Sequence, residues 1–315
     1  MILVTGSAGH LGEALMRTLR AAGRPARGLD ILRSEWTDIV GSVADPGVVE
    51  RAMDGVTQVI HAATLHKPHV ATHTRQAFVD INITGTLQLL EAAKRTGVTA
   101  FLYTSTTSAF GDALVPPEGA PAAWITESVV PVPKNIYGVT KVAAEDLCQL
   151  AHRNQGLACL VLRTSRFFPE EDDNPAARDA YAPDNLKATE YLYRRVDVED
   201  VVSAHLAALE RAPAIGFGRF IISAPTPFVR DDVTELRRDA PAALRRRVPE
   251  WEAIYGRLGW RMLPTIDRVY DSSKSRAELG WKPRHDFATV LARASETGDI
   301  RSALAKTIGA KGYHS

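Results

Sequence analysis

A tyrosine and a lysine stand four residues apart in the segment Tyr137-Gly138-Val139-Thr140-Lys141. Residues at this spacing lie on one face of a helix, so the Lys141 ammonium can approach the Tyr137 phenol. A neighbouring positive charge favours the phenolate and lowers a tyrosine pKa from about 10 towards the range of a working general acid–base. The spacing also arises often by chance, so its significance depends on the segments around it.

A cluster of hydroxyl side chains runs from Thr104 to Ser108, one strand-and-helix unit before this pair. We predict a strand over 100–104 and a helix over 137–154. In a parallel sheet, ligands bind at the carboxyl ends of the strands. We therefore expect the hydroxyl cluster and Tyr137 to belong to one site.

The first twelve residues, MILVTGSAGHLG, contain an apolar run at Ile2–Val4 followed by Gly6, Gly9 and Gly12. The run predicts a buried strand, and a helical pattern begins at Glu13. Because glycines carry no side chain, such a turn lets a pyrophosphate approach backbone N–H groups at the positive end of a helix. Taken alone, the triplet could equally be an ordinary strand-to-helix turn.

Asp30 ends the segment Gly23–Asp30, eighteen residues after Gly12, where a second strand should finish. A carboxylate at this place can accept hydrogen bonds from adenosine ribose hydroxyls. Its charge would repel a 2′-phosphate, so the sequence favours NAD over NADP. Arg27 and Arg33 stand nearby and leave NADP open, and a solvated aspartate at a strand end is the alternative.

Strands and helices alternate over much of the chain. The further expected strands are 58–63, 158–163 and 219–223, and the further expected helices are 49–53, 78–96 and 196–211. This alternation predicts an α/β fold with a parallel sheet joined by right-handed crossovers. The small residues of His61–Thr64, which follow one of these strands, would let the backbone approach a cofactor.

The composition is that of a globular protein. Of 315 residues, 45% are hydrophobic and 24% are charged, with 38 basic against 37 acidic residues, which indicates neither a nucleic-acid nor a membrane partner. No apolar run approaches the roughly 18 residues of a membrane span, and no signal-peptide pattern precedes the first strand, so we expect a cytoplasmic protein. Cys148 and Cys159 are expected to be buried thiols rather than disulfide partners or zinc ligands.

Together these segments resemble the extended short-chain dehydrogenase/reductases of the NAD-dependent epimerase/dehydratase family. The resemblance extends along nearly the whole chain, in Thr5–Gly12, Asp30, Gly41–Asp45, His61–Ala63, Asn82–Thr86, Phe110-Gly111, Tyr137–Lys141, Leu162-Arg163, Asp271–Lys274 and Leu279–Trp281. It implies a Rossmann-type doubly wound parallel sheet with a small C-terminal substrate-binding lobe. Residues 1–165, completed by about 195–223 and 266–275, would form the NAD-binding domain, and residues 166–194 and 224–315 the substrate-binding lobe, lid and tail. It also implies a homodimer formed through helices 78–96 and 137–154.

The resemblance implies roles for individual residues as well. Tyr137 would be the acid–base, Lys141 would lower its pKa and hold the nicotinamide ribose, and Thr106, or Ser105 in its place, would hydrogen-bond the reacting oxygen. The other predicted cofactor-binding residues are Gly6, Gly9, His10, Leu11, Gly12, Asp30, Ser42, Val43, Ala62, Ala63, Thr64, Asn82 and Thr104. The predicted substrate-binding residues are Lys67, Thr106, Thr107, Arg166 and Arg195. No metal is predicted, although His66, His69 and His73 could share a helical face, because no carboxylate signature accompanies them.

The two positions after the active hydroxyl separate the reactions of this family. Members that eliminate water carry an Asp-Glu pair there, whereas this chain has Thr107 and Ser108, so dehydration is not expected. We predict an NAD-dependent oxidoreductase that acts on a secondary alcohol or ketone of a sugar-like or polyhydroxylated small molecule. A nucleotide-sugar 4-epimerase with tightly held NAD is the alternative, weakened by Phe110 in place of the usual tyrosine. A non-catalytic NAD-binding regulatory protein is the third hypothesis.

Four further parts of the chain carry weaker signals. Arg166, Arg194 and Arg195 could clamp a phosphate or carboxylate, or could form internal salt bridges with the acidic residues at 170–173. The stretch 170–184 has no periodicity and predicts a loop over the site, either a lid or a surface loop. The basic run 237–247 predicts a solvated helix face, and the polar tail 297–315 gives no clear prediction of order.

Overall fold

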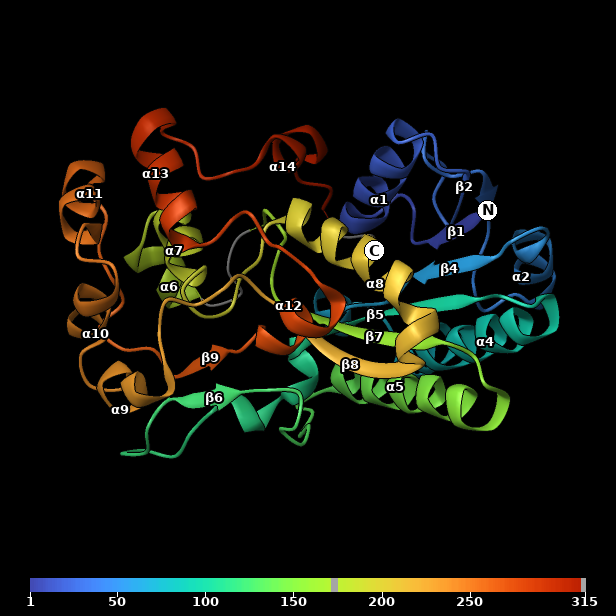
Figure 1. Cartoon of the computed structure of the whole chain (residues 1–315), viewed down its shortest axis with the longest axis horizontal. Helices are drawn as coiled ribbons and strands as arrows, with labels where there is room; N and C mark the ends of the chain where they lie inside the picture. Colours follow the sequence, from blue (N-terminus) through green and yellow to red (C-terminus); the bar gives the residue numbers. More distant parts are fainter. Residues whose placement is uncertain (171–174, 313–315) are drawn as a thin grey trace.

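Seven parallel strands form one sheet in the order β3-β2-β1-β4-β5-β7-β8 in the computed structural model, which describes residues 1–170 and 175–312 (Figure 1). They are β1 (Ile2–Thr5), β2 (Ala26–Asp30), β3 (Ile39–Val40), β4 (Gln58–His61), β5 (Ala100–Thr106), β7 (Cys159–Thr164) and β8 (Phe217–Ile222). The strand order reverses between β1 and β4, which leaves a crevice at the carboxyl ends of the strands. The predicted Rossmann-type sheet is confirmed.

Helices bury apolar side chains on both faces of this sheet. One face is covered by α1 (His10–Ala21) and α8 (Val198–Ile215), which pack Leu15 and Val201 onto the sheet. The other face is covered by α2 (Pro46–Met53), α4 (Gly85–Thr96) and α5 (Ile136–Gln155). Cys148 and Cys159 are free thiols buried in the second layer, as predicted.

The helix predicted over 78–96 is divided into three parts. A short helix, α3 (Arg75–Phe78), leads into a π-helical turn at Val79–Thr84, and α4 follows from Gly85. Turns of this kind are rare and occur often at functional sites. Asn82 lies in this turn with its side chain buried.

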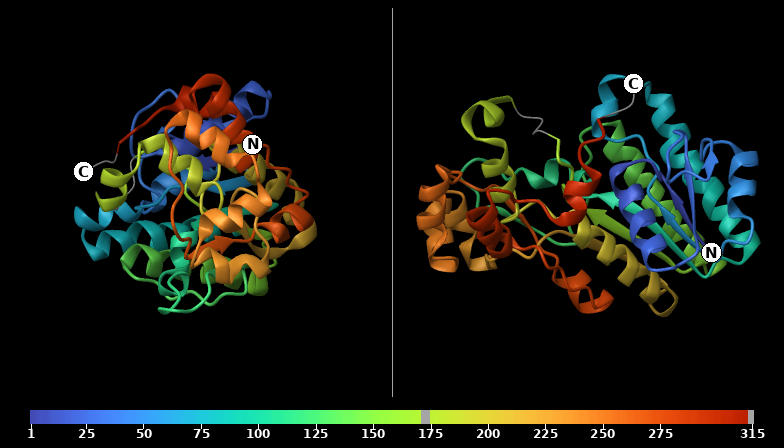
Figure 2. Two further views of the ribbon diagram at one scale, coloured as in Figure 1. Left: turned by 90° about the vertical axis from the view of Figure 1, so that its left-hand side faces the viewer. Right: turned by 90° about the horizontal axis from the view of Figure 1, so that it is seen from above.

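A second, smaller group of elements lies at one end of the molecule, away from the sheet (Figure 2). In it, β6 (Ala123–Ile125) pairs in parallel with β9 (Arg268–Tyr270). The helices that share its apolar core are α7 (Pro183–Glu190), α9 (Val233–Leu236), α10 (Ala240–Arg247), α11 (Trp251–Leu258) and α13 (Phe287–Thr297), while α12 (Ser273–Leu279) packs against α8 and β8. The proposed division into an NAD-binding domain and a substrate-binding lobe stays a prediction.

The loop predicted over 170–184 is wrong for the part that the structure describes. A helix, α6 (Pro175–Ala180), occupies this stretch, and α7 begins at Pro183. Proline suits the first turn of a helix, and both helices begin with one. Helix α7 also buries Leu186 and Ala188 against the rest of the protein, which the sequence pattern of this acidic stretch does not reveal. Residues 171–174 lie outside the described residues, and the lid stays a prediction.

The polar tail contains one more helix, α14 (Ala303–Ile308), which lies against α1 and α8 (Figure 1). The basic run is the solvated helix face predicted for it, because the arginines at the end of α10 are largely exposed and pair with acidic residues such as Asp232 and Glu252. Leu87 and Val139 are exposed on α4 and α5, and the homodimer stays a prediction. Within the described residues, no helix combines the length and apolarity that crossing a membrane requires.

Candidate active site

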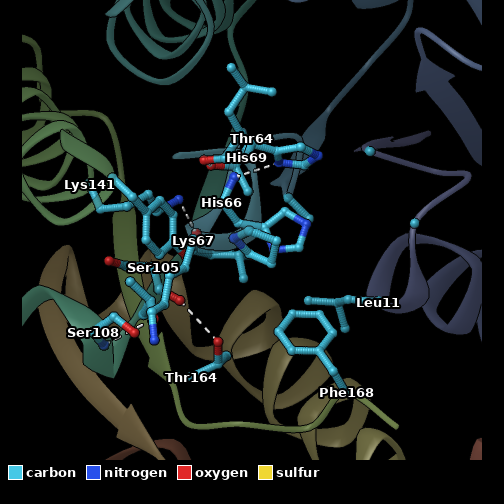
Figure 3. Close-up of a pocket in the computed structure, with 18 of the residues that line it drawn as sticks. Leu11, Thr64, His66, Lys67, His69, Ser105, Ser108, Lys141, Thr164 and Phe168 are labelled. Carbon is cyan, nitrogen blue, oxygen red and sulfur yellow. Dashed lines mark hydrogen bonds between the residues drawn. The ribbon is translucent and has the colours of Figure 1, made fainter. Parts of the chain in front are cut away.

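A cavity of about 760 Å³ opens at the carboxyl ends of the strands (Figure 3). Its volume falls in the range of small-molecule and cofactor sites, about 300–1,000 Å³. The predicted catalytic and cofactor-binding residues that line it are Gly6, Gly9, His10, Leu11, Gly12, Asp30, Ser42, Val43, Ala62, Ala63, Thr64, Thr104, Thr106, Tyr137 and Lys141. Of the predicted substrate-binding residues, Lys67, Thr106, Thr107 and Arg166 line it as well. The structure thus brings together residues that the sequence spreads over seven segments.

The glycine turn after β1 forms a backbone cradle. Gly6 has a positive φ of 73°, and a Cβ on Gly12 would lie 1.8 Å from the Gly6 carbonyl oxygen, so both positions require glycine. Helix α1 starts from Gly9 with no side-chain cap among the described residues, which leaves its first N–H groups directed at the cavity. Orphan amides at the positive end of a helix fit the pyrophosphate of a dinucleotide.

Asp30 lies at the end of β2, on the rim of the same cavity. Its carboxylate accepts hydrogen bonds from the backbone N–H groups of Ala8 and Leu32, both at 2.9 Å, which fix its position beside the glycine turn. Arg27 instead donates to the carbonyl oxygens of Ala52 and Asp54 at 2.8 and 2.7 Å. One of the two guanidinium groups that could attract a 2′-phosphate, that of Arg27, is therefore held at another place.

The segment after β4 is fixed against the glycine turn through Thr5. The Thr5 hydroxyl accepts hydrogen bonds from the N–H groups of Ala62 and Ala63, both at 3.1 Å, and lies 2.7 Å from Nδ1 of His61. The other ring nitrogen of His61 lies 3.0 Å from the Thr86 hydroxyl. Burial lowers the pKa of His61 to about 3, so this histidine is a neutral structural link.

Tyr137 and Thr106 both line the cavity. Tyr137 lies in the first turn of α5, where the Asn135 side chain caps the helix by accepting a hydrogen bond from Gly138 N at 3.1 Å. Tyr137 is buried, and its side chain lines the cavity together with Thr106. Burial raises the pKa of Tyr137 to about 12, and the neighbouring Thr106 hydroxyl opposes this rise.

Lys141 follows one turn later on the same helix and is 2% exposed. Its ammonium donates a hydrogen bond to the Thr104 carbonyl at 2.7 Å and lies 4.1 Å from the centre of the Tyr103 ring. Burial lowers the pKa of Lys141 to about 7. The expected lowering of the Tyr137 pKa is therefore wrong in direction for this structure, because burial disfavours both the phenolate and the ammonium.

Asn82 does not line the cavity, although it was predicted to bind the cofactor. Its side-chain oxygen accepts hydrogen bonds from Leu65 N and the Thr64 hydroxyl, both at 2.9 Å. Its amide nitrogen donates to the Leu65 carbonyl at 2.9 Å and to Thr140 at 3.0 Å. Asn82 therefore ties the cavity wall at Thr64 to helix α5 and acts by positioning.

The hydroxyls around Thr106 have different surroundings. Ser105 donates to the buried Glu145 carboxylate at 2.6 Å, so its hydroxyl is committed to the interior. The Thr106 hydroxyl accepts a hydrogen bond from Ser108 N at 3.0 Å, and a 3₁₀ turn at Thr107–Phe110 begins there. Thr107 and Ser108 line the cavity without adding a carboxylate to it.

The three arginines considered above separate in the structure. Arg166 and Arg194 line the cavity. Arg195 does not, because its guanidinium pairs with buried Glu190 at 2.7 Å and donates to the Phe168 carbonyl at 2.9 Å. Arg195 therefore forms an internal ion pair instead of the predicted contact with a substrate. Its partner, Glu190, lies outside the acidic residues 170–173 that were expected to provide the carboxylate.

The three histidines lie next to one another, and the ring centres of His69 and His73 are 5.0 Å apart. His66 caps a 3₁₀ turn at Lys67–Ala71 that contains His69, and the rings of His66 and His69 meet edge to face with 4.6 Å between their centres. Burial and the neighbouring His69 lower the pKa of His66 to about 3. Within residues 1–170 and 175–312, no three His, Cys, Asp or Glu side chains are arranged to hold a metal ion.

Several lining residues come from parts of the chain that carried no sequence signal. They include Phe168, Arg268, Tyr270, Lys311 and Gly312. Arg268 and Tyr270 lie on β9, which is brought to the cavity by pairing with β6. These residues have neither a motif nor a regular spacing, so only the tertiary structure identifies them.

Known proteins resemble this chain in fold and in sequence. The model of the NAD dependent epimerase/dehydratase family matches residues 2–221. The chain is 31% identical to Sterol demethylase protein B of Methylococcus capsulatus, covering 95% of this chain and 99% of the relative. It is 28% identical to a dTDP-glucose 4,6-dehydratase of Streptomyces antibioticus, covering 93% of this chain and 90% of the relative.

A solved structure resembles the whole chain. It is a short-chain dehydrogenase/reductase superfamily protein from Agrobacterium tumefaciens with bound NAD. The TM-score is 0.65 at 25% identity, over 98% of this chain and 99% of that one. The likeness therefore includes the C-terminal elements that the family model leaves out.

Proposed function

Because the chain belongs to the NAD-dependent epimerase/dehydratase family, we propose that it is an NAD-dependent oxidoreductase acting on a secondary alcohol or ketone. The substrate we propose is a sugar-like or polyhydroxylated small molecule. The observation that carries the proposal is that Thr106, Tyr137 and Lys141 line one cavity, with Lys141 one helical turn after Tyr137 on α5.

The residues of the cavity have two roles, cofactor binding and proton transfer. The glycine turn and Asp30 hold NAD at its pyrophosphate and adenosine ribose, and NAD supplies the hydride acceptor or donor. Tyr137 exchanges a proton with the substrate oxygen, and Thr106 hydrogen-bonds the same oxygen. The Thr104 carbonyl holds the Lys141 side chain at the end of β5 by accepting its hydrogen bond. When Lys141 is protonated, it supplies positive charge near the Tyr137 phenol.

The neighbourhood of Thr106 argues against loss of water as the reaction. A dehydration requires groups that remove a proton from carbon and protonate the departing hydroxyl. Thr107 and Ser108 follow Thr106 here, and neither hydroxyl titrates near neutral pH. We therefore propose simple oxidation or reduction, although one relative is a 4,6-dehydratase.

A nucleotide-sugar 4-epimerase is the second candidate, and one observation favours it. Arg166, Arg194 and Arg268 all line the cavity, and guanidinium groups match the oxygens of a diphosphate. An epimerase returns the hydride to its own substrate, so it forms no net NADH.

The test is to incubate the purified protein with NAD and a panel of free sugars, sugar acids and nucleotide sugars. NADH formation with one class of compound would support the oxidoreductase and identify its substrate. An isomerised nucleotide sugar without net NADH would support the epimerase and refute the first candidate. Binding of NAD without turnover of any compound would favour a non-catalytic NAD-binding protein.

A further inference from the structure

The C-terminal tail is anchored on the helices that cover the dinucleotide side of the sheet. The Ser302 hydroxyl caps α14 and donates to the buried Asp197 carboxylate at 2.7 Å. Leu304 N donates to Glu199 in the first turn of α8 at 3.0 Å. These contacts hold α14 beside α1, so the residues that follow it run towards the glycine turn (Figure 1).

Lys311 then meets the first turn of α1 through both its side chain and its backbone. Its ammonium lies 2.5 Å from the Glu13 carboxylate, which also pairs with Arg17 at 2.7 Å. Its backbone N–H points to Nε2 of His10 at 3.2 Å and to the Glu170 carboxylate at 3.3 Å. His10 and Glu170 are themselves 3.0 Å apart.

The opposite side of this contact is formed by the segment after β7. The Phe168 ring meets the His10 ring edge to face at 5.5 Å between centres, and it lies towards Leu11 in the cavity (Figure 3). Lys311 and Gly312 line the same cavity as Gly9 and His10. The tail and residues 168–170 thus converge over the helix end where a pyrophosphate would lie.

We propose that residues 168–170 and 309–312 form a clasp over the pyrophosphate end of the NAD site, held shut by the Lys311–Glu13 ion pair. With the clasp closed, NAD leaves the site only after the tail has moved. The clasp therefore slows release of the cofactor and makes Lys311 a positioning residue of the cofactor site. This inference rests on NAD binding in the proposed function and not on the identity of the substrate.

The test measures NADH dissociation from the full chain by stopped-flow displacement with excess NAD. Lys311→Met should release NADH about tenfold faster, a size typical of coupling between a contact and a binding site. Lys306→Met is the matched control, because Lys306 lies on the same tail but pairs with Asp299 at 3.4 Å on the surface. It should change the rate by less than about twofold.

Glu13→Gln removes the other partner and should speed release to a similar extent. The double variant should be no faster than either single variant, since both remove one contact. Equal rates for Lys311→Met and Lys306→Met would overturn the clasp, as would fully additive effects of Lys311→Met and Glu13→Gln. Absence of turnover with every alcohol would instead contradict the proposed reaction, because the dissociation rates are measured without a substrate.

Discussion

Gly9→Ala should weaken NAD binding without weakening the fold. Gly9 has an extended backbone, with φ −73° and ψ 171°, that alanine adopts readily. An added Cβ would meet the Gly6 carbonyl oxygen at 3.3 Å, which a shift of a few tenths of an ångström relieves. The same methyl would stand in the cavity at the end of α1, where the pyrophosphate must approach the backbone.

The expected loss of NAD affinity is about 100-fold, the size of effect that displacement of a bound group by roughly 1 Å produces. Gly12→Ala provides the contrast. Its Cβ would lie 1.8 Å from the Gly6 carbonyl oxygen, and ordinary contact begins at 3.4 Å, so turn and helix would have to separate by about 1.6 Å. Overpacking against backbone should lower the free energy of unfolding by about 3 kcal/mol and also abolish NAD binding.

Calorimetric titration with NAD and urea unfolding without NAD distinguish the two variants. Gly9→Ala should keep the wild-type free energy of unfolding within about 0.5 kcal/mol, whereas Gly12→Ala should not. Wild-type NAD affinity in Gly9→Ala would refute the placement of the pyrophosphate. A loss of stability in Gly9→Ala equal to that of Gly12→Ala would refute the steric reasoning.

Three further predictions concern charge. Glu145→Gln removes the carboxylate that lies 2.7 Å from the buried Arg163 guanidinium, and should lower the free energy of unfolding by about 3–5 kcal/mol. Asp146→Asn, at an exposed neighbouring position, should lower it by less than about 1 kcal/mol. Equal losses for the two variants in urea unfolding would contradict this prediction. Burial lowers the pKa of Lys141 in the folded protein to about 7, against an ordinary value of 10.5. Between these two pH values the unfolded chain keeps a proton on Lys141 that the folded protein has lost, so the free energy of unfolding should rise as the pH rises from about 7 to 10.5. A rise of the same size in Lys141→Met would refute Lys141 as its cause. Asp30→Ser removes the charge that repels a 2′-phosphate and should reduce the preference for NAD over NADP by at least about tenfold in binding titrations, and an unchanged preference would exclude Asp30 as its source.

The sheet and the dinucleotide turn follow from local sequence patterns. An apolar strand, three glycines and an acidic residue at the next strand end are all separated by short stretches, so their physical roles can be inferred without a tertiary structure. The position of the Thr104–Thr106 hydroxyls at the cavity also follows from such patterns, because residues at strand ends converge in any parallel sheet. The π-helical turn at Val79–Thr84 could not be inferred, since its pattern is that of an ordinary helix.

Other features depend on contacts between distant segments. The spacing of Tyr137 and Lys141 predicts their common face but not their burial, and burial decides the direction of both pKa shifts. The pairing of Arg195 with Glu190 depends on the fold of the segment after β7. Lys311 reaches His10 from the opposite end of the chain, a contact that no local pattern contains.

The most direct test of the central claim is to compare NAD affinity with turnover in Tyr137→Phe, using the substrate class found with the compound panel. Phenylalanine keeps the buried ring and removes only the hydroxyl. We expect NAD affinity within about twofold of wild type and turnover reduced by about 10²–10⁴-fold, the usual contribution of a general acid–base. Tyr181→Phe, which removes a phenol outside the main cavity, should keep full turnover. Wild-type turnover in Tyr137→Phe would contradict the assignment of Tyr137 as the group that exchanges the proton.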